Sequence, residues 1–121
     1  MIINHLNRIH NAGAKGIAIL IDPDKVVNDS RLIKLINICV ENRVDYFLVG
    51  GSLITTNNIG HIVSRIKENC NIPVVLFPGS NMYLDFSADA IFFLSLISGR
   101  NPELLIGQHV VAAPIIKRSG M

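Results

Sequence analysis

Hydrophobic and polar positions along the chain follow two alternating periods. Four short apolar runs, each ending in polar or glycine-containing residues, predict strands at residues 17–21, 45–49, 73–77 and 89–94. Between these runs, apolar residues recur at helical spacing, which predicts helices over residues 2–12, from Asn28 or Asp29, from Asn57 or Asn58, and from Asn101. Strands that alternate with helices indicate a parallel sheet with right-handed crossovers.

The first strand is the most distinctive element. Residues 17–21 are five consecutive apolar residues rich in Ile, and this pattern predicts a strand buried on both faces. The run stops at Asp22-Pro23-Asp24-Lys25, where Pro23 cannot donate a ladder hydrogen bond, so the chain leaves the sheet. Two carboxylates and a lysine therefore follow the carboxyl end of a strand, where ligands of α/β proteins usually bind. A turn whose aspartates only cap backbone groups is the alternative.

The helical patterns carry recognisable start and stop signals. Asn28 or Asp29 can cap the second helix, and Asn101 precedes Pro102 at the first position of the last one. Pro114 should kink or end that last helix. The apolar stripe of the second helix is formed by Leu32, Leu35, Ile36, Cys39 and Val40.

The 121 residues form a single domain with no linker or internal boundary, spanning residues 1–121. About four βα units are half of a (β/α)₈ TIM barrel, which typically has about 250 residues. An open four-stranded α/β domain is the alternative, but it would leave two bare, apolar sheet edges. We therefore expect the first half of a barrel, and we expect it either to self-associate or to pair with a C-terminal half-barrel.

Composition excludes several classes of protein. The 11 Lys and Arg residues against 9 Asp and Glu residues, without any tryptophan or basic tract, argue against nucleic-acid binding. No apolar segment approaches the length of a membrane span, and the N-terminus has no signal-peptide core. Cys39 and Cys70 stand outside any Cys-x-x-Cys pattern, which favours free thiols and a cytoplasmic location.

Small and polar residues follow the other strands as well. Gly50, Gly51 and Ser52 end the second strand, and Gly79 and Ser80 follow the third. A glycine pair lets the backbone approach a ligand and offers N–H groups to phosphate oxygens. A carboxylate and a hydroxyl from neighbouring strands can hold Mg²⁺ together with substrate phosphates. Each element alone is also compatible with an ordinary turn.

Taken together, the motifs resemble those of a known family. The segments that carry the likeness are Leu20-Ile-Asp-Pro-Asp-Lys25, Leu48-Val-Gly-Gly-Ser-Leu53, Val75-Leu-Phe-Pro-Gly79, Ala88-Asp-Ala-Ile-Phe-Phe-Leu-Ser-Leu96 and Asn101-Pro-Glu-Leu-Leu-Ile-Gly-Gln-His109. In this order and at these spacings they resemble the first half of a geranylgeranylglyceryl phosphate synthase, of the prenylglyceryl phosphate synthase family. The resemblance covers nearly the whole chain.

The resemblance implies a (β/α)₈ barrel and a Mg²⁺-dependent prenyltransferase. The family joins a polyprenyl diphosphate, typically geranylgeranyl diphosphate, to sn-glycerol 1-phosphate, forms an ether-lipid precursor and releases diphosphate. Its metal-binding aspartate matches Asp22, and its second metal-site position matches Ser52. Gly50, Gly51, Gly79 and Ser80 are candidates for binding substrate, whereas no established role falls on Asp24 or Lys25.

The prenyl chain requires an apolar trough, which could be lined by Phe77, Met82, Tyr83, Leu84 and Phe86; these residues are equally compatible with ordinary packing. The family's sn-glycerol 1-phosphate site and its Tyr-x-Glu segment lie in the second half of the barrel and match nothing here. We therefore expect no catalysis by this polypeptide alone, and no histidine is assigned as the base: His61 and His109 are expected to be surface or packing residues, and His5 and His10 to lie on the surface. A non-catalytic truncated half-barrel and a metal-independent half-barrel that binds a sugar phosphate are the alternatives.

Overall fold

The computed structural model describes residues 2–51, 54–80 and 83–121. Its elements in chain order are α1 (Ile2–Asn11), β1 (Ala18–Ile21), the 3₁₀ turn η1 (Pro23–Lys25), α2 (Asp29–Glu41), β2 (Tyr46–Gly51), α3 (Ile59–Asn69), β3 (Val74–Pro78), β4 (Ala90–Ile91), the π-helical turn η2 (Glu103–Gly107) and α4 (Gln108–Ser119). All four described strands are parallel and adjacent in chain order, β1-β2-β3-β4. Because an open doubly wound sheet reverses its strand order at a switch point, this uninterrupted order indicates the first half of a barrel.

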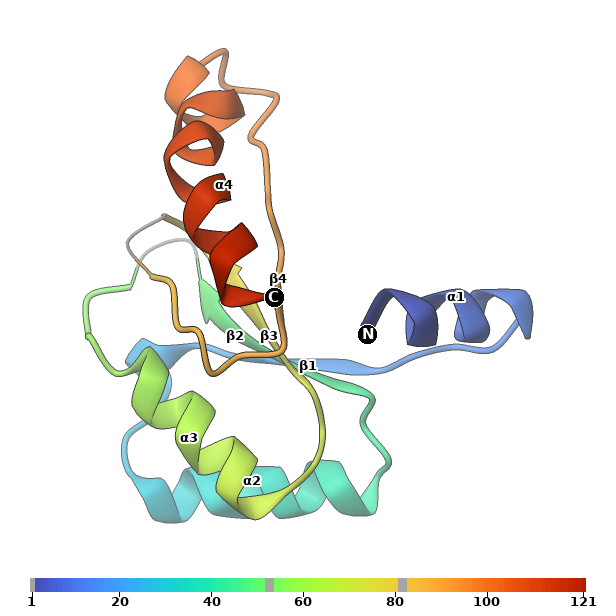
Figure 1. Cartoon of the computed structure of the whole chain (residues 1–121). Helices are drawn as coiled ribbons and strands as arrows, with labels where there is room; N and C mark the ends of the chain where they lie inside the picture. The colour runs from blue at the N-terminus through green and yellow to red at the C-terminus, as the bar shows by residue number, and fades with distance from the viewer. Residues whose placement is uncertain (1, 52–53, 81–82) are drawn as a thin grey trace.

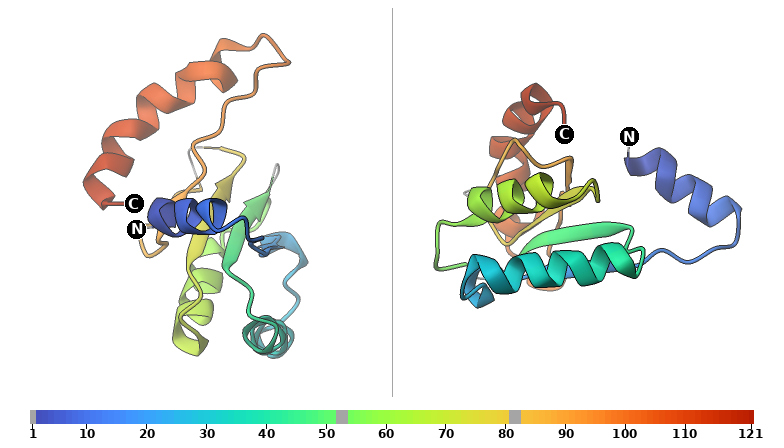
Figure 2. Two further views of the ribbon diagram at one scale, coloured as in Figure 1. Left: turned by 90° about the vertical axis from the view of Figure 1, so that its right-hand side faces the viewer. Right: turned by 90° about the horizontal axis from the view of Figure 1, so that it is seen from below.

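Helices α2 and α3 cover one face of this sheet, as Figures 1 and 2 show. The apolar stripe of α3 (Ile59, Ile62, Val63 and Ile66) is buried, as its spacing predicts. Side chains of β2 and β3 that point to the same face complete the core, among them Phe47, Val49 and Leu76. In α2 the buried residues are Leu32, Ile36 and Cys39, whereas Val40 is exposed, so the predicted stripe is one position too wide.

The opposite face of the sheet is open at β1, where Leu20 is exposed, whereas Tyr46 and Val75 on the same face are buried. The prediction that β1 is buried on both faces is wrong, since Ile17 and Leu20 are 52% and 51% exposed while Ile21 is buried. At the amino end of this face, α1 and the C-terminal residues lie over the strands. They enclose a pocket of about 560 Å³, whose lining includes Leu6, Tyr46 and Val75. The apolar run of β1 is therefore typical of a strand inside a closed barrel, of which this chain covers one side only.

The last βα unit departs most from the predicted boundaries. The fourth strand spans only Ala90–Ile91 rather than residues 89–94, although the N–H of Phe92 still donates to the carbonyl of Leu76 at 2.9 Å. It lies at the edge of the sheet, where β3 is its one partner among the described strands. Asn101 caps the following helix by accepting from the N–H of Glu103 at 3.0 Å. Pro114 does not end α4, which continues to Ser119 and stands apart from α2 and α3 (Figure 1).

Candidate active-site rim

The carboxyl ends of β1, β2 and β3 form one rim of the half-barrel. Register places Ile21 beside Val49 and Gly51 beside Pro78, so the residues that follow these strands lie at the same edge of the sheet. Asp22 follows β1, and Gly79 and Ser80 follow β3. The structure therefore brings the predicted site residues to one rim, except for Ser52, which lies outside the described residues.

Asp22 is held in place by the turn that follows it. Its backbone is extended, and its carboxylate caps η1 by accepting from the N–H of Asp24 at 3.1 Å. The other carboxylate oxygen lies 3.4 Å from Nζ of Lys25, whose side chain is largely exposed. An ion pair of this length at the surface is weak, so it leaves the Asp22 carboxylate accessible to another cation.

Gly51 lies directly beside this carboxylate. A Cβ built on Gly51 would stand 4.0 Å from Oδ1 of Asp22, which is an ordinary contact distance. Gly50 has a different requirement: its φ is +146°, and a Cβ there would lie 2.0 Å from the carbonyl oxygen of Phe77. Gly50 is therefore needed for the close approach of β2 and β3, while Gly51 keeps the space next to Asp22 free.

Asp24 is fixed by contacts with the segment that follows β2. Its carboxylate accepts from the backbone N–H and the hydroxyl of both Thr55 and Thr56, at distances from 2.8 to 3.1 Å. The hydrogen bonds from the Thr55 N–H and the Thr56 hydroxyl are the largest causes that lower the pKa of Asp24 to about 2. This contact is not predicted by the sequence analysis. The one feature of the sequence that points to it is that Thr55 and Thr56 are the only threonines in the chain and directly follow the second strand motif.

The oxygen donors at the rim are compatible with Mg²⁺ that is held mainly by water and substrate. Among the described residues no group of three His, Cys, Asp or Glu side chains could enclose a metal ion. Mg²⁺ does not need such a cage, because it is usually bound through one or two carboxylates, several waters and the phosphates of a substrate. A single accessible carboxylate at Asp22, beside the open space at Gly51, fits that mode of binding.

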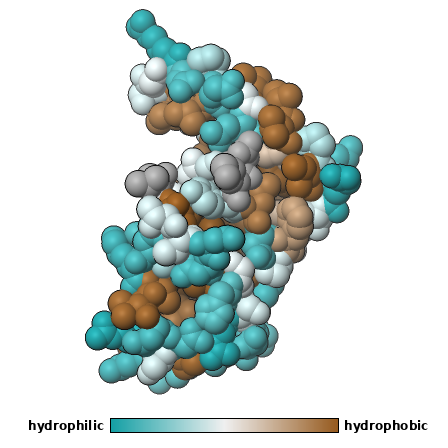
Figure 3. All heavy atoms as spheres, turned by 90° about the vertical axis from the view of Figure 1, so that its left-hand side faces the viewer, coloured by the Kyte–Doolittle hydropathy of each residue, from teal (hydrophilic) through white to brown (hydrophobic). Residues whose placement is uncertain are grey.

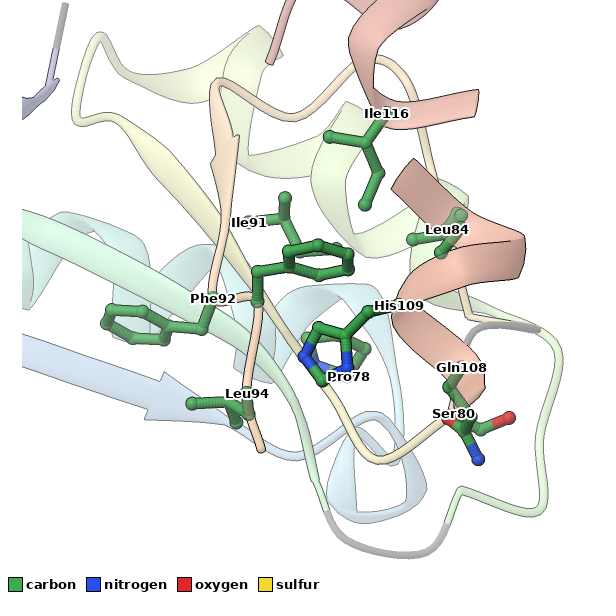
Figure 4. Close-up of a pocket in the computed structure, with 11 residues that line it drawn as sticks. Pro78, Ser80, Leu84, Ile91, Phe92, Leu94, Gln108, His109 and Ile116 are labelled. Carbon is green, nitrogen blue, oxygen red and sulfur yellow. The ribbon is translucent and has the colours of Figure 1, made fainter. Parts of the chain in front are cut away.

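A small pocket separates the ends of β3 and β4 from α4 (Figure 4). It has a volume of about 40 Å³, and Ser80, Leu84, Phe92 and His109 are among the residues that line it. The His109 ring packs edge-on against Phe93, with ring centroids 4.3 Å apart, and its Nε2 lies 3.3 Å from Oγ of Ser95. This pocket can hold one or two water molecules but not a prenyl chain.

The aromatic and apolar residues expected to line a prenyl trough do not gather in one cavity. Phe77 packs edge-on against Phe92, and the Tyr83 hydroxyl donates to the carbonyl of Ile54 at 2.7 Å. Leu84 lines the small pocket, Phe86 is exposed, and Met82 lies outside the described residues. On the face shown in Figure 3, apolar side chains gather in the upper half, near α4 and the segment before it. Exposed side chains there include Leu96, Ile97 and Ile106.

Three of the four histidines contact other side chains, and the fourth, His10, is exposed. His61 contacts Asp29 at 2.7 Å across α2 and α3, and His109 belongs to the small pocket. His10 is exposed, whereas His5 is only partly exposed because its Nδ1 forms a 2.5 Å hydrogen bond with the Tyr46 hydroxyl. None of the helices in the described parts of the chain is both long and apolar enough to cross a bilayer.

Comparison with known proteins places the whole chain beside one group of enzymes. The PcrB family model matches residues 12–120. A geranylgeranylglyceryl phosphate synthase of Chitinophaga pinensis is 50% identical over 122 residues, which cover 95% of this chain and 48% of that protein. The corresponding enzyme of Pyrococcus horikoshii is 39% identical over 104 residues, which cover 85% of this chain and 41% of that protein.

Solved structures show similarity to the same group of enzymes, again over part of their length. The wild-type enzyme of Thermoplasma volcanium superposes with a TM-score of 0.78 at 34% identity, over 88% of this chain and 43% of that one. The Thermoplasma acidophilum (S)-3-O-geranylgeranylglyceryl phosphate synthase, in complex with its substrate sn-glycerol-1-phosphate, superposes with a TM-score of 0.77 at 26% identity. That match covers 93% of this chain and 46% of the other. The chain therefore spans about half the length of the curated relatives it matches.

Proposed function

The chain belongs to the PcrB family, and from this premise we propose that it forms the metal and diphosphate side of a prenyltransferase active site. The reaction is transfer of a geranylgeranyl or other polyprenyl group from its diphosphate to sn-glycerol 1-phosphate, with release of diphosphate. Its relatives bear the name geranylgeranylglyceryl phosphate synthase, and one solved neighbour holds sn-glycerol-1-phosphate. The observation that carries the proposal is the accessible Asp22 carboxylate beside Gly51 at the rim.

Asp22, together with Ser52, is the proposed position for Mg²⁺. Departure of diphosphate from an allylic carbon leaves positive character on the carbon and negative charge on the departing oxygens. A bound Mg²⁺ would offset that negative charge at the oxygens. Asp22 holds its position because the end of β1 and the N–H of Asp24 fix it, so little side-chain entropy is lost on binding.

Gly51, Gly79 and Ser80 are proposed to face the diphosphate. The space next to Gly51 lets phosphate oxygens approach the rim without meeting a side chain, and Ser80 adds a hydroxyl at the end of the neighbouring strand. Gly50 is proposed to bind substrate as well, and it also lets β2 and β3 approach closely at this edge. These residues bind and orient the leaving group, while the acceptor hydroxyl needs a base from another part of the barrel.

Four further βα units are proposed to complete the site. The relatives are about twice as long as this chain, and the strand order here is that of half a barrel. Both outer strands, β1 and β4, have one unpaired edge, and the open face between them exposes Leu20. A second half-barrel, as a continuation, a separate chain or a second copy, would cover this face and close the sheet.

Calorimetric titration tests the metal and diphosphate assignment. Inorganic diphosphate should bind the chain with Mg²⁺ and lose affinity when a chelator removes the metal. Asp22→Asn preserves shape but removes the charge, so binding should weaken by about 2 kcal/mol or more, roughly 30-fold. Asp29→Asn, an exposed aspartate on α2, is the matched control and should bind normally. If the affinity for diphosphate is unchanged by the chelator, a metal-independent sugar-phosphate site is favoured instead.

Turnover tests the larger proposal. The chain alone should not transfer a geranylgeranyl group to sn-glycerol 1-phosphate, whereas fusion to the second half of the Chitinophaga relative should give activity. In that fused protein Asp22→Asn should remove most of the activity. Full activity of the unfused chain would show that the other four units are not needed, and activity of the fused Asp22→Asn variant equal to that of the parent would refute the role of Asp22.

A further inference from the structure

Asp24 lies one residue beyond Pro23, yet its carboxylate is the most heavily hydrogen-bonded group at the rim. Oδ1 accepts from the Thr56 N–H at 3.0 Å and from its hydroxyl at 2.8 Å. Oδ2 accepts from the Thr55 N–H and hydroxyl, both at 2.9 Å. A carboxylate has about four lone-pair positions, so these four donors occupy it fully. Asp24 is therefore not free to bind a cation, although it stands only two residues from Asp22.

These hydrogen bonds join two loops that are distant in sequence. Asp24 belongs to η1, which follows β1, while Thr55 and Thr56 belong to the segment that follows β2. Asn58 strengthens the connection, since its Nδ2 donates to the carbonyl of Pro23 at 3.3 Å. The segment after β2 is further fixed by the buried side chain of Ile54. The loops after β1 and β2 thus form one hydrogen-bonded unit.

The same residue also orients Asp22. The N–H of Asp24 donates to Oδ1 of Asp22, so its backbone holds one carboxylate while its side chain holds the two threonines. Oδ1 of Asp22 is the atom that lies 4.0 Å from the Cβ position of Gly51. Asp24 therefore connects the end of β1 to the segment after β2 and fixes the distance between them at the rim.

We propose that Asp24 is a positioning residue: it locks the Thr55-Thr56 segment against η1 and so keeps the Asp22 carboxylate at the side of Gly51, where Mg²⁺ and diphosphate bind. The inference rests on the proposed function for its consequence, but its structural part stands without any ligand. Charge-assisted hydrogen bonds are roughly twice as strong as neutral ones, which suits a group that must hold two loops against thermal motion. Groups that support a ligand-binding residue often matter nearly as much as the residue itself.

Asparagine is the informative replacement at this position. Its amide keeps the size of the carboxylate but replaces one acceptor oxygen by an NH₂ group, which would face the donors of one of the two threonines. The loop contact should therefore loosen without any change in core packing. Thr55→Ser retains the N–H and the hydroxyl, so it should preserve the contact, whereas Thr55→Val removes one hydroxyl donor and should weaken it partly.

The experiment measures amide exchange and chemical shifts by NMR on the whole chain, followed by calorimetry with Mg²⁺ and inorganic diphosphate. Asp24→Asn should accelerate exchange of the Thr55 and Thr56 amides at least tenfold, shift the amide signals of Asp22 and Gly51, and lower the affinity for Mg²⁺-diphosphate at least tenfold. Slow exchange in α3 and β3 shows that the variant is folded. Asp29→Asn removes the same charge elsewhere and should change none of these signals. Thr55→Ser should resemble the parent chain in all three measurements.

Two results would overturn the inference. The first is unchanged exchange at Thr55 and Thr56 with unchanged signals at Asp22 and Gly51 in Asp24→Asn. The second is a loosened loop with parental affinity for Mg²⁺-diphosphate. If the parent chain binds no Mg²⁺-diphosphate, the proposed function fails at that step. The exchange rates and the signals of Asp22 and Gly51 then decide the positioning role by themselves.

Discussion

The two faces of the sheet contain similarly apolar residues but have very different environments. On the face covered by α2 and α3, Ile36, Phe47 and Ile62 have no exposed surface. On the other face Leu20 of β1 is half exposed, although Tyr46 and Val75 are buried. Both sets are apolar because a barrel strand meets helices on its outer side and other strands across the interior. The apolar residues on the covered face stabilise the fold of this chain, whereas those on the open face are suited to contact another half-barrel.

Truncating one side chain on each face should give the largest difference in stability. Ile62→Ala removes fully buried methyl groups and leaves a cavity, so the free energy of unfolding should fall by about 3 kcal/mol. Leu20→Ala, on the open face, should change it by less than about 1 kcal/mol, because that side chain is already half exposed. Urea denaturation followed by circular dichroism measures both values. Equal losses would show that this chain already packs both faces.

The adjacent glycines at the end of β2 offer a sharper comparison within one strand. Gly50→Ala places a methyl group against the carbonyl of Phe77 and strains a φ of +146°, so it should cost about 2 kcal/mol or more. Gly51→Ala meets Asp22 only at ordinary contact distance and should leave stability nearly unchanged. The same denaturation measurement applies to both variants. A stable Gly50→Ala protein would mean that β2 and β3 are not so closely spaced.

Charge on the open face should change association rather than stability. Leu20→Lys should reduce self-association of the isolated chain, because it puts an ammonium group on the exposed apolar surface between the two sheet edges. Ile38→Lys is the matched control, since Ile38 is 47% exposed on α2. Sedimentation velocity over a range of concentrations measures the effect. Equal reduction by both variants would locate the contact elsewhere.

The smallest effect is expected from an ion pair on the covered side. The hydrogen bond from His61 is the main cause that lowers the pKa of Asp29, and Arg65 adds a contact at 3.0 Å. A lowered folded pKa stabilises the fold above the unfolded value of 3.8. That contribution is lost as the pH falls through the lower folded pKa. Denaturation of the parent chain and of Asp29→Asn between pH 6 and pH 2 should therefore converge at the acid end; curves that stay parallel would contradict the pairing.

The success of sequence reasoning differed between the two faces for a physical reason. Helical spacing fixed the covered face almost to the residue in α3, because Ile59, Ile62, Val63 and Ile66 meet partners from this same chain. The apolar run in β1 also correctly indicates a barrel strand, but its periodicity cannot say which partner covers Leu20. Pattern alone therefore overestimated burial at β1 and the length of β4, which are the two outer strands of the described sheet.

At the rim, too, some positions could be predicted from the sequence and others could not. Asp22 could be placed at the end of β1 because a five-residue apolar run stops at a proline-containing turn. The pairing of Asp24 with Thr55 and Thr56 could not, because it joins residues 31 and 32 positions apart whose contact depends on the parallel register of β1 and β2. Gly50 is expected to bind substrate, and the structure adds a reason that the sequence could not show: a Cβ there would lie 2.0 Å from the carbonyl oxygen of Phe77.

Hydrogen exchange of this chain, alone and fused to the second half of the Chitinophaga relative, tests the open face most directly. Fusion should slow exchange at the outer edges of the sheet, over Ala18–Ile21 and around Phe92, while α2 and α3 keep their rates. Unchanged exchange at both edges in a folded, fused protein, or new protection confined to α2 and α3, would contradict the claim that the open face receives the other half of the barrel.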